Sequence, residues 1–267
     1  MWRCLTGSIS GNLAIVGPAS NSDINFITGI GTFTESTWKA GSVTVTAGSL
    51  SIAGFLGEIS SSTLSSGPAD KVSVDVAGHL SIAGPSGSFP TGIVAAAFPG
   101  GTGNSGDVAV RAGSLSIING GEISATNAGF GIGGSVTVSS QGPLSLSGGA
   151  QVTSSTAGPG NGGSVQVTAQ GVLSLSGGAG ILALANATAS GNAGSVTVNA
   201  PQITVTSGAQ LASTTAGTSR GGTVNVNTSG ALLLENEAQI AASATGPKIG
   251  VGRHGDGRGQ YPDHRRA

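Results

Sequence analysis

Charged and aromatic side chains are both scarce in this 267-residue chain, at 8% and 3% of the residues. Ordinary soluble domains carry roughly 25% charged residues. The formal net charge of −1 argues against a basic protein that binds nucleic acid or an anionic membrane. Cys4 is the only cysteine, which excludes an intramolecular disulfide and a cysteine-based metal cluster and leaves the redox compartment open.

Long hydrophobic runs are also missing. Nowhere do about 18 apolar residues follow one another, the length that a membrane-spanning helix needs. Residues 1–5 run directly into Thr-Gly-Ser at 6–8, so the chain starts without a hydrophobic stretch of signal-peptide length. We therefore expect either that the protein stays inside the cell or that its natural beginning precedes this sequence.

Glycine, by contrast, is abundant, with 49 residues. A disordered low-complexity chain could be rich in glycine, but it would also be poor in valine, isoleucine and leucine. Here these apolar residues alternate with small polar ones, as in Ser-Val-Thr-Val-Thr at 42–46. A two-residue period is typical of a β-strand with one buried face. The pattern therefore predicts an ordered β protein.

One three-part module recurs along most of the chain. Its first segment, Gly-Ser-Val-x-Val, is anchored at Val43, Val72, Val108, Val136, Val165, Val196 and Val224, with spacings of 29, 36, 28, 29, 31 and 28 residues. The second segment, Leu-Ser-Ile, is anchored at Leu50, Leu80, Leu115, Leu144, Leu173, Ile203 and Leu232, with spacings of 30, 35, 29, 29, 30 and 29 residues. The third segment is anchored at Ile59, Ile123, Val152, Ile181, Leu211 and Ile240, and the repeat around Ile93 is irregular.

Strands as short as these segments bury too little surface to be stable alone. If each module makes one turn of a coil, equivalent apolar residues stack in columns, with strands ~4.8 Å apart, and form the core. The sequence thus predicts an all-β fold: a right-handed parallel β-helix, or solenoid, of about seven three-strand coils with a ~29-residue period. Glycines such as Gly48 and Gly113 should lie at the corners, where sharp bends favour them.

The module boundaries divide the chain into three parts. We expect residues 1–40 to form an irregular segment or a partial coil, residues 41–246 to form the coils, and residues 247–267 to form an unpacked basic tail. The two longest spacings bracket the irregular repeat. We therefore expect Pro85–Gly106 to protrude from the rod, with the glycine-rich run at 100–106 as a flexible insertion.

The tail contains five of the ten lysines and arginines of the chain, Lys248, Arg253, Arg258, Arg265 and Arg266. A basic tail could bind an anionic partner. However, residues 253–267 can be back-translated with permitted codons so that the frame shifted by one nucleotide reads GTVTVGASTLTIAG, which matches the next module. We therefore expect that the end of the chain is frameshifted.

The wording of the repeats resembles a known family. Gly-Gly-Ser-Val-x-Val at 162–167 and Leu-Ser-Leu-Ser-Gly-Gly-Ala-Gln-Val-x-Ser-Ser-Thr-Ala-Gly at 144–158 are similar to the repeats of filamentous-haemagglutinin-type bacterial proteins, over roughly residues 41–246. The resemblance implies a right-handed β-helix that is secreted through a two-partner pathway, with an outer-membrane secretion partner, and displayed at the cell surface. Exported members begin with a signal peptide and a secretion domain that contains Asn-Pro motifs. This chain has no Asn-Pro, so we expect it to be a fragment.

Parallel β-helices also host polysaccharide lyases and hydrolases, and the fold alone does not decide function. Such enzymes need clustered carboxylates, or a Ca²⁺ site with a base. Glu58 and Glu122 occupy the module position that Gln151, Gln210 and Gln239 hold in other repeats. We therefore expect both glutamates to be solvent-facing ladder residues rather than catalytic ones.

The other candidates favour structural roles in the same way. Asp75 could approach Arg111 or Asp107 on a neighbouring strand, where a surface ion pair is worth under about 1 kcal/mol. His79 has no second histidine or cysteine at ligand spacing. We accordingly assign no catalytic, cofactor-binding or metal-binding residue, expect no cofactor, and expect that the chain is not an enzyme.

The function expected from the sequence is that of a non-catalytic adhesin or stalk segment, secreted or held at the cell surface. Its partners would be a carbohydrate or a protein of a host or cell surface, with no nucleic acid, and the edge of its last coil could associate with another chain. An ice-binding β-helix would need a regular threonine array. Thr44 and Thr46 fit such an array, but Ala109 and Arg111 occupy the equivalent positions two repeats later.

Overall fold

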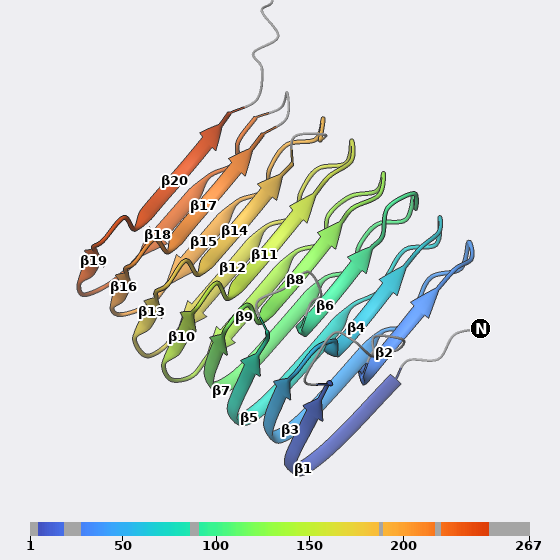
Figure 1. The fold of residues 1–267 in the computed structure, drawn as a ribbon, viewed down its shortest axis with the longest axis horizontal. Helices are drawn as coiled ribbons and strands as arrows, with labels where there is room; N and C mark the ends of the chain where they lie inside the picture. The colour runs from blue at the N-terminus through green and yellow to red at the C-terminus, as the bar shows by residue number, and fades with distance from the viewer. Residues whose placement is uncertain (1–4, 19–27, 86–90, 187–188, 217–219, 246–267) are drawn as a thin grey trace, which may run out of the picture.

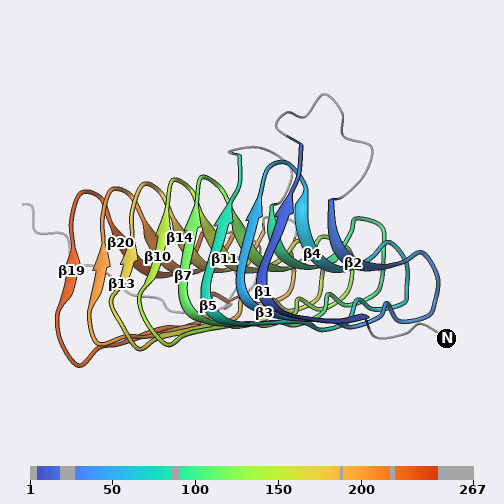
Figure 2. The same cartoon turned by 90° about the horizontal axis from the view of Figure 1, so that it is seen from below.

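The computed structural model describes residues 5–18, 28–85, 91–186, 189–216 and 220–245, and their regular structure is entirely β-strand. The strands wind into a parallel β-solenoid of about seven turns with a ~29-residue spacing (Figures 1 and 2). The predicted coil of stacked modules is therefore confirmed. The described residues contain no helix that is long and apolar enough to cross a membrane.

The three segments of each module build two sheets, one of 12 strands and one of 8 strands. In the early coils the first and second segments join in single long strands, which are β1 (Leu5–Val16), β3 (Val43–Ala53), β5 (Val72–Ala83) and β7 (Val108–Ile118). In the later coils the first segments are β9 (Val136–Ser140), β12 (Val165–Ala169), β15 (Val196–Asn199) and β18 (Val224–Asn227). The second segments there are β10 (Leu144–Ser147), β13 (Leu173–Leu175), β16 (Ile203–Val205) and β19 (Leu232–Leu234).

The third segments of the modules form the 8-stranded sheet. Its members are β2 (Thr28–Thr34), β4 (Gly57–Thr63), β6 (Gly92–Ala97), β8 (Glu122–Asn127), β11 (Gln151–Thr156), β14 (Gly180–Ala185), β17 (Gln210–Thr215) and β20 (Gln239–Ala244). Each strand pairs in parallel with the equivalent strand of the next coil, and successive members lie side by side in Figure 1.

The predicted valine column is confirmed in detail. In-register parallel pairs join Val43, Val72, Val108, Val136, Val165, Val196 and Val224 in that order. All are buried except Val224, which is partly buried in the last coil. The leucine column, apart from the exposed Leu232, and the third-segment isoleucine column belong to the same core or pack against it. Burial of apolar surface at ~25 cal/mol per Å² is the main stabilising contribution to such a stack.

At the bend between the first and second segments, successive coils approach each other closely. In β7, a Cβ atom on Gly113 would lie 2.5 Å from the carbonyl oxygen of Ala77 in the coil below. A residue with a Cβ atom would therefore force the two coils apart at this point. In the next coil Pro143 precedes Leu144, and proline has no N–H to donate to the neighbouring strand. The strand is interrupted at this point, and β9 and β10 are separate.

The prediction that Pro85–Gly106 protrudes is wrong for residues 92–97. Residues 92–97 form β6, which is buried and pairs with β4 and β8, so that Ile93 lies between Ile59 and Ile123. Within the 100–106 run, the Gly103 N–H donates to the Ser65 carbonyl of the preceding coil. The long spacing between the valine anchors shows that this repeat contains additional residues, but it does not show whether they precede or follow β6.

The two ends of the stack expose different edges. At the N-terminal end, β1 pairs with β3 and β2 with β4, so the coils extend back to Leu5. At the other end, β18, β19 and β20 have a partner strand on one side only within the described chain, and the residues of β19 are 42–44% exposed. The expectation that residues 250–267 lie outside the coil concerns residues outside the described ranges.

Candidate functional site

Two neighbouring hollows follow the bend of the 12-stranded sheet on its outer face. One part, of about 630 Å³, is lined by residues of β5, β7, β9 and β12 and of the bends that follow them. A second part, of about 390 Å³, is lined by residues of β12, β15 and β18 and of their bends. Both parts include Thr168 and Gln170. The two hollows therefore adjoin each other at this coil, and together their lining residues come from six successive strands.

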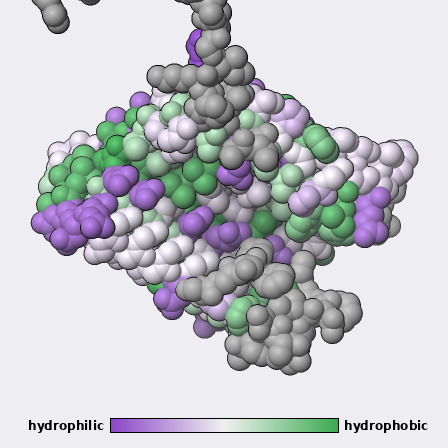
Figure 3. Space-filling view, turned by 45° about the horizontal axis from the view of Figure 1, so that its top comes forward, coloured by the Kyte–Doolittle hydropathy of each residue, from purple (hydrophilic) through white to green (hydrophobic). Residues whose placement is uncertain are grey.

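Amide and hydroxyl side chains alternate with alanine and valine along these two hollows, which we together call the axial groove. The amides are Gln141, Gln166, Gln170, Asn199 and Asn227. Some of the amides form a ladder, because the Asn227 Nδ2 donates to the Asn199 Oδ1 at 2.9 Å. The Asn199 Nδ2 in turn donates to the Thr168 Oγ1 at 3.4 Å. Small, weakly polar residues also cover much of the molecular face in Figure 3, with hydrophilic and hydrophobic patches between them.

Three charged residues, Lys71, Asp75 and Arg111, lie at the N-terminal end of the axial groove. Asp75 and Arg111 occupy paired positions on β5 and β7, as the sequence indicated. The expected ion pair between them is absent, since the ion pair that the described residues form joins Lys39 to Asp70 instead. Paired Cα atoms do not force side-chain ends together, because an exposed ion pair gains too little to fix a long arginine side chain. Both side chains are exposed.

The prediction that Glu58 and Glu122 face solvent is wrong for Glu58, which is buried, whereas Glu122 is partly exposed. Glu58 is only 4% exposed, and Gly92 lies between the two glutamates on the intervening strand β6. Burial, then the charge of Glu122, raise the pKa of Glu58 to about 7, and a hydrogen bond with Ser60 partly offsets them. Burial likewise raises the pKa of Glu122, although the Ser124 Oγ donates to its Oε1 at 3.0 Å.

The burial of Glu58 could not be read from the alternation of apolar and polar residues, because alternation indicates only the direction in which a side chain points. Ser60 and Ser62 of β4, Val94 of β6, Ser124 of β8 and Thr153 of β11 point out of the core like the glutamates, and they are buried as well. The outer face of the 8-stranded sheet is therefore closed to solvent here. The sequence does contain one feature that could have pointed to this pair: two coils carry glutamate at a position where three others carry glutamine.

An apolar pocket of about 510 Å³ adjoins this pair of glutamates. It is lined by Phe33, Leu64 and Phe98, and by Ser60, the hydrogen-bond partner of Glu58. The three apolar side chains are exposed at its rim. The sequence analysis did not single out this pocket, because its members come from three coils and share no module position that is conserved in type among the repeats.

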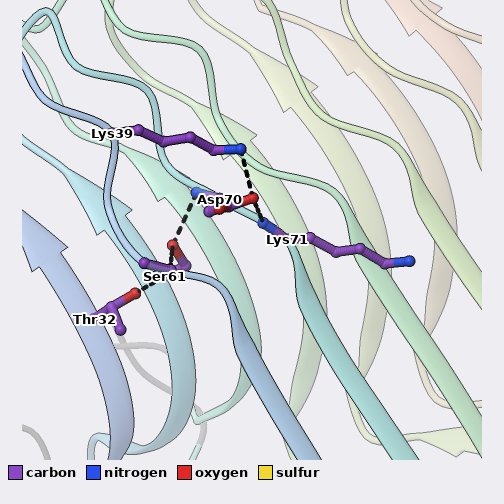
Figure 4. A network of polar contacts seen from close by, with 6 residues as sticks. Thr32, Lys39, Ser61, Asp70 and Lys71 are labelled. Carbon is purple, nitrogen blue, oxygen red and sulfur yellow. Dashed lines mark hydrogen bonds and ion pairs between the residues drawn. The ribbon is translucent and has the colours of Figure 1, made fainter. Parts of the chain in front are cut away.

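A network of polar contacts joins the corners of neighbouring coils near Lys39 (Figure 4). The Lys39 Nζ lies 2.8 Å from the Asp70 Oδ1, to which the Lys71 N–H also donates at 2.6 Å. The Asp70 N–H donates to the Ser61 Oγ at 2.9 Å, and the Ser61 Oγ and the Thr32 Oγ1 both donate to the Gly41 carbonyl. These contacts satisfy corner backbone groups, so the network is structural.

His79 lies beside Ser114 of the next coil, with 2.9 Å between its Nδ1 and the Ser114 Oγ. Within the described ranges, no group of three or more His, Cys, Asp or Glu side chains could hold a metal ion. The histidine thus takes part in an exposed contact between coils.

Comparison with known proteins adds no family to these observations: no family model, curated protein or solved structure matches the chain.

Proposed function

We propose that this chain is a non-catalytic stalk or adhesive segment of a bacterial surface protein of the filamentous-haemagglutinin type, exported with an outer-membrane secretion partner. The observation that carries the proposal is the unbroken in-register stack from Val43 to Val224. In such a stack each coil is held by its neighbours along a continuous core. A rod of this kind has the stiffness to hold a binding surface away from a cell.

The outer columns of the rod support contact with a carbohydrate or with a protein of another cell surface. They offer hydroxyl and amide groups at regular intervals, as at Thr137, Gln166 and Thr197, and few charges. A net charge of −1 gives no attraction for nucleic acid.

Surface labelling tests the proposal directly. Antibodies raised against the folded coils should label intact cells of the organism that encodes the chain, and protease treatment of intact cells should remove the signal. Beads that carry the purified chain should also adhere to cells, whereas beads that carry an unrelated protein of similar charge should not. Labelling that requires permeabilised cells would overturn the proposal.

Polysaccharide hydrolysis is the competing function, and the pair Glu58 and Glu122 is the observation that favours it. Glycosidases use two carboxyl groups, one of them held protonated near neutral pH. Against this function, a carboxyl group that is 4% exposed offers a polymer no access. Reducing-end assays on a polysaccharide panel discriminate the two functions: activity that disappears in Glu58→Gln would replace adhesion with catalysis.

A further inference from the structure

The axial groove has the length and direction of an extended polymer. It crosses β5, β7, β9, β12, β15 and β18, which are neighbours in this order. Five strand spacings of ~4.8 Å give a length of about 24 Å along the solenoid axis. One spacing is close to the length of one pyranose unit in an extended chain, so successive sugars would meet equivalent positions on successive coils.

The side chains that line the axial groove favour one class of polymer over others. Its amide and hydroxyl side chains can both donate and accept hydrogen bonds, which suits a ligand with hydroxyl groups along its whole length. Within the described part of the chain, the charged residues of the groove are two cations and one anion, all at one end. A densely sulfated or phosphorylated chain would need basic residues along the groove. Among the described residues no aromatic side chain lines either part, so a peptide with large apolar anchors would find no pocket there.

We infer that the axial groove is a binding site for an extended neutral polysaccharide, aligned with the solenoid axis and held by hydrogen bonds to the glutamine, asparagine, serine and threonine side chains. The inference rests on the proposed adhesive function and names the ligand class and the surface that would serve it. Gln166 and Gln170 lie near the middle of the groove, on the coil that both of its parts share. Both side chains are exposed.

The experiment is affinity electrophoresis of the full chain in gels that contain purified neutral polysaccharides (a β-glucan, a xylan, a mannan or a galactan), with pectate and heparin as acidic comparisons. We expect at least one neutral polymer to retard the chain. Oligosaccharides of that polymer should bind more tightly with each added sugar, up to about five or six units, since the groove spans five strand spacings.

Two variants locate the site, and a third is the matched control. Gln166→Ala and Gln170→Ala should each weaken binding roughly two- to tenfold, the value of one net hydrogen bond. Gln210→Ala removes the same exposed side chain from β17, on the other sheet, and should leave binding unchanged. Thermal unfolding of each variant checks that the coils remain intact.

Three outcomes would overturn the inference: no retardation by any neutral polymer, retardation by pectate or heparin alone with loss in Arg111→Ala, or equal losses in the groove variants and the control. Positive surface labelling without neutral-glycan binding would leave the stalk function standing and remove only this site. Labelling confined to permeabilised cells, together with intact glycan binding, would leave this binding site standing and remove the surface function.

Discussion

The coils before and after residue 130 share one core but differ in their bends and surfaces. Before it, single strands such as β7 run through the bend; after it, β9 and β10 or β12 and β13 are separate. The earlier coils also carry most of the charge, because Arg220, Glu235 and Glu237 are the charged residues of the described part from 136 to 245. The stacked core is thus the same whether the strand is continuous or interrupted at the bend. Charged and polar surface residues can therefore differ between coils without a change in the core.

The largest effect should come from the core, and it should differ between the middle of the rod and its end. Leu144→Ala removes a fully buried side chain in the middle of the stack and should lower the free energy of unfolding by about 2–5 kcal/mol. Leu232→Ala removes the equivalent leucine from the last coil, where it is 42% exposed, and should cost about 1 kcal/mol or less. Urea unfolding measures both, and equal losses would mean that the last coil is covered in solution.

The second effect is a pH dependence that the early coils alone should show. Glu58 has a pKa of about 7 in the fold, raised from 4.5, so the unfolded chain ionises first and the fold loses stability as pH rises from about 4.5 through about 7. Glu58→Gln removes this loss, on the order of 3 kcal/mol above pH 7. The glutamine should fit, since Gln151 and Gln210 hold equivalent positions.

Thermal midpoints at pH 4 and pH 8 measure this effect. The variant should gain on the wild type at pH 8, and the difference should shrink toward pH 4. Glu35→Gln, a change at an exposed position directly after β2, is the control because it alters neither Glu58 nor Glu122. An equal gain for Glu58→Gln at both pH values would show that the carboxyl group of Glu58 is not held protonated by the fold.

The sequence predicted the stacked columns of apolar core residues, but it did not predict the surroundings of the residues outside the core. The register from Val43 to Val224 follows from spacing, because apolar residues in equivalent positions must stack to be buried. The burial of Glu58 could not be predicted, since a two-residue period gives the direction of a side chain but not what closes over it. The place of β6 was missed because added residues shift Ile93 in the sequence without moving it in the stack. The axial groove could not be predicted either, because it depends on the curvature of the sheet, and the repeat sequence does not indicate that curvature.

The third effect tests why glycine recurs at the bend. Gly113→Ala would place a Cβ atom 2.5 Å from the Ala77 carbonyl oxygen, so the coils must separate locally at a cost of about 1–3 kcal/mol. Gly11 lies at the same bend in β1, but a Cβ atom there meets nothing within 4 Å. Gly11→Ala should therefore leave the unfolding midpoint nearly unchanged. Similar losses for both would assign the requirement to backbone conformation rather than to stacking.

The smallest effect should come from the ion pair of the early coils, between Lys39 and Asp70. Their side chains are 57% and 22% exposed, and exposed pairs contribute up to about 1 kcal/mol. Lys39→Met keeps the aliphatic part of the side chain and should lower stability by less than that, with the loss fading as salt screens the wild-type pair.

Asp70→Ala should cost more than Lys39→Met, because it removes not only the ion pair but also the acceptor of the Lys71 N–H at 2.6 Å, and a hydrogen bond to a charged group is worth roughly 1.5–3 kcal/mol. The order of the two losses therefore separates the corner network from the ion pair. Urea unfolding at low and high salt gives both quantities. A larger loss for Lys39→Met, persisting at high salt, would show that the ammonium group holds the corner and that the backbone hydrogen bonds of Asp70 are secondary.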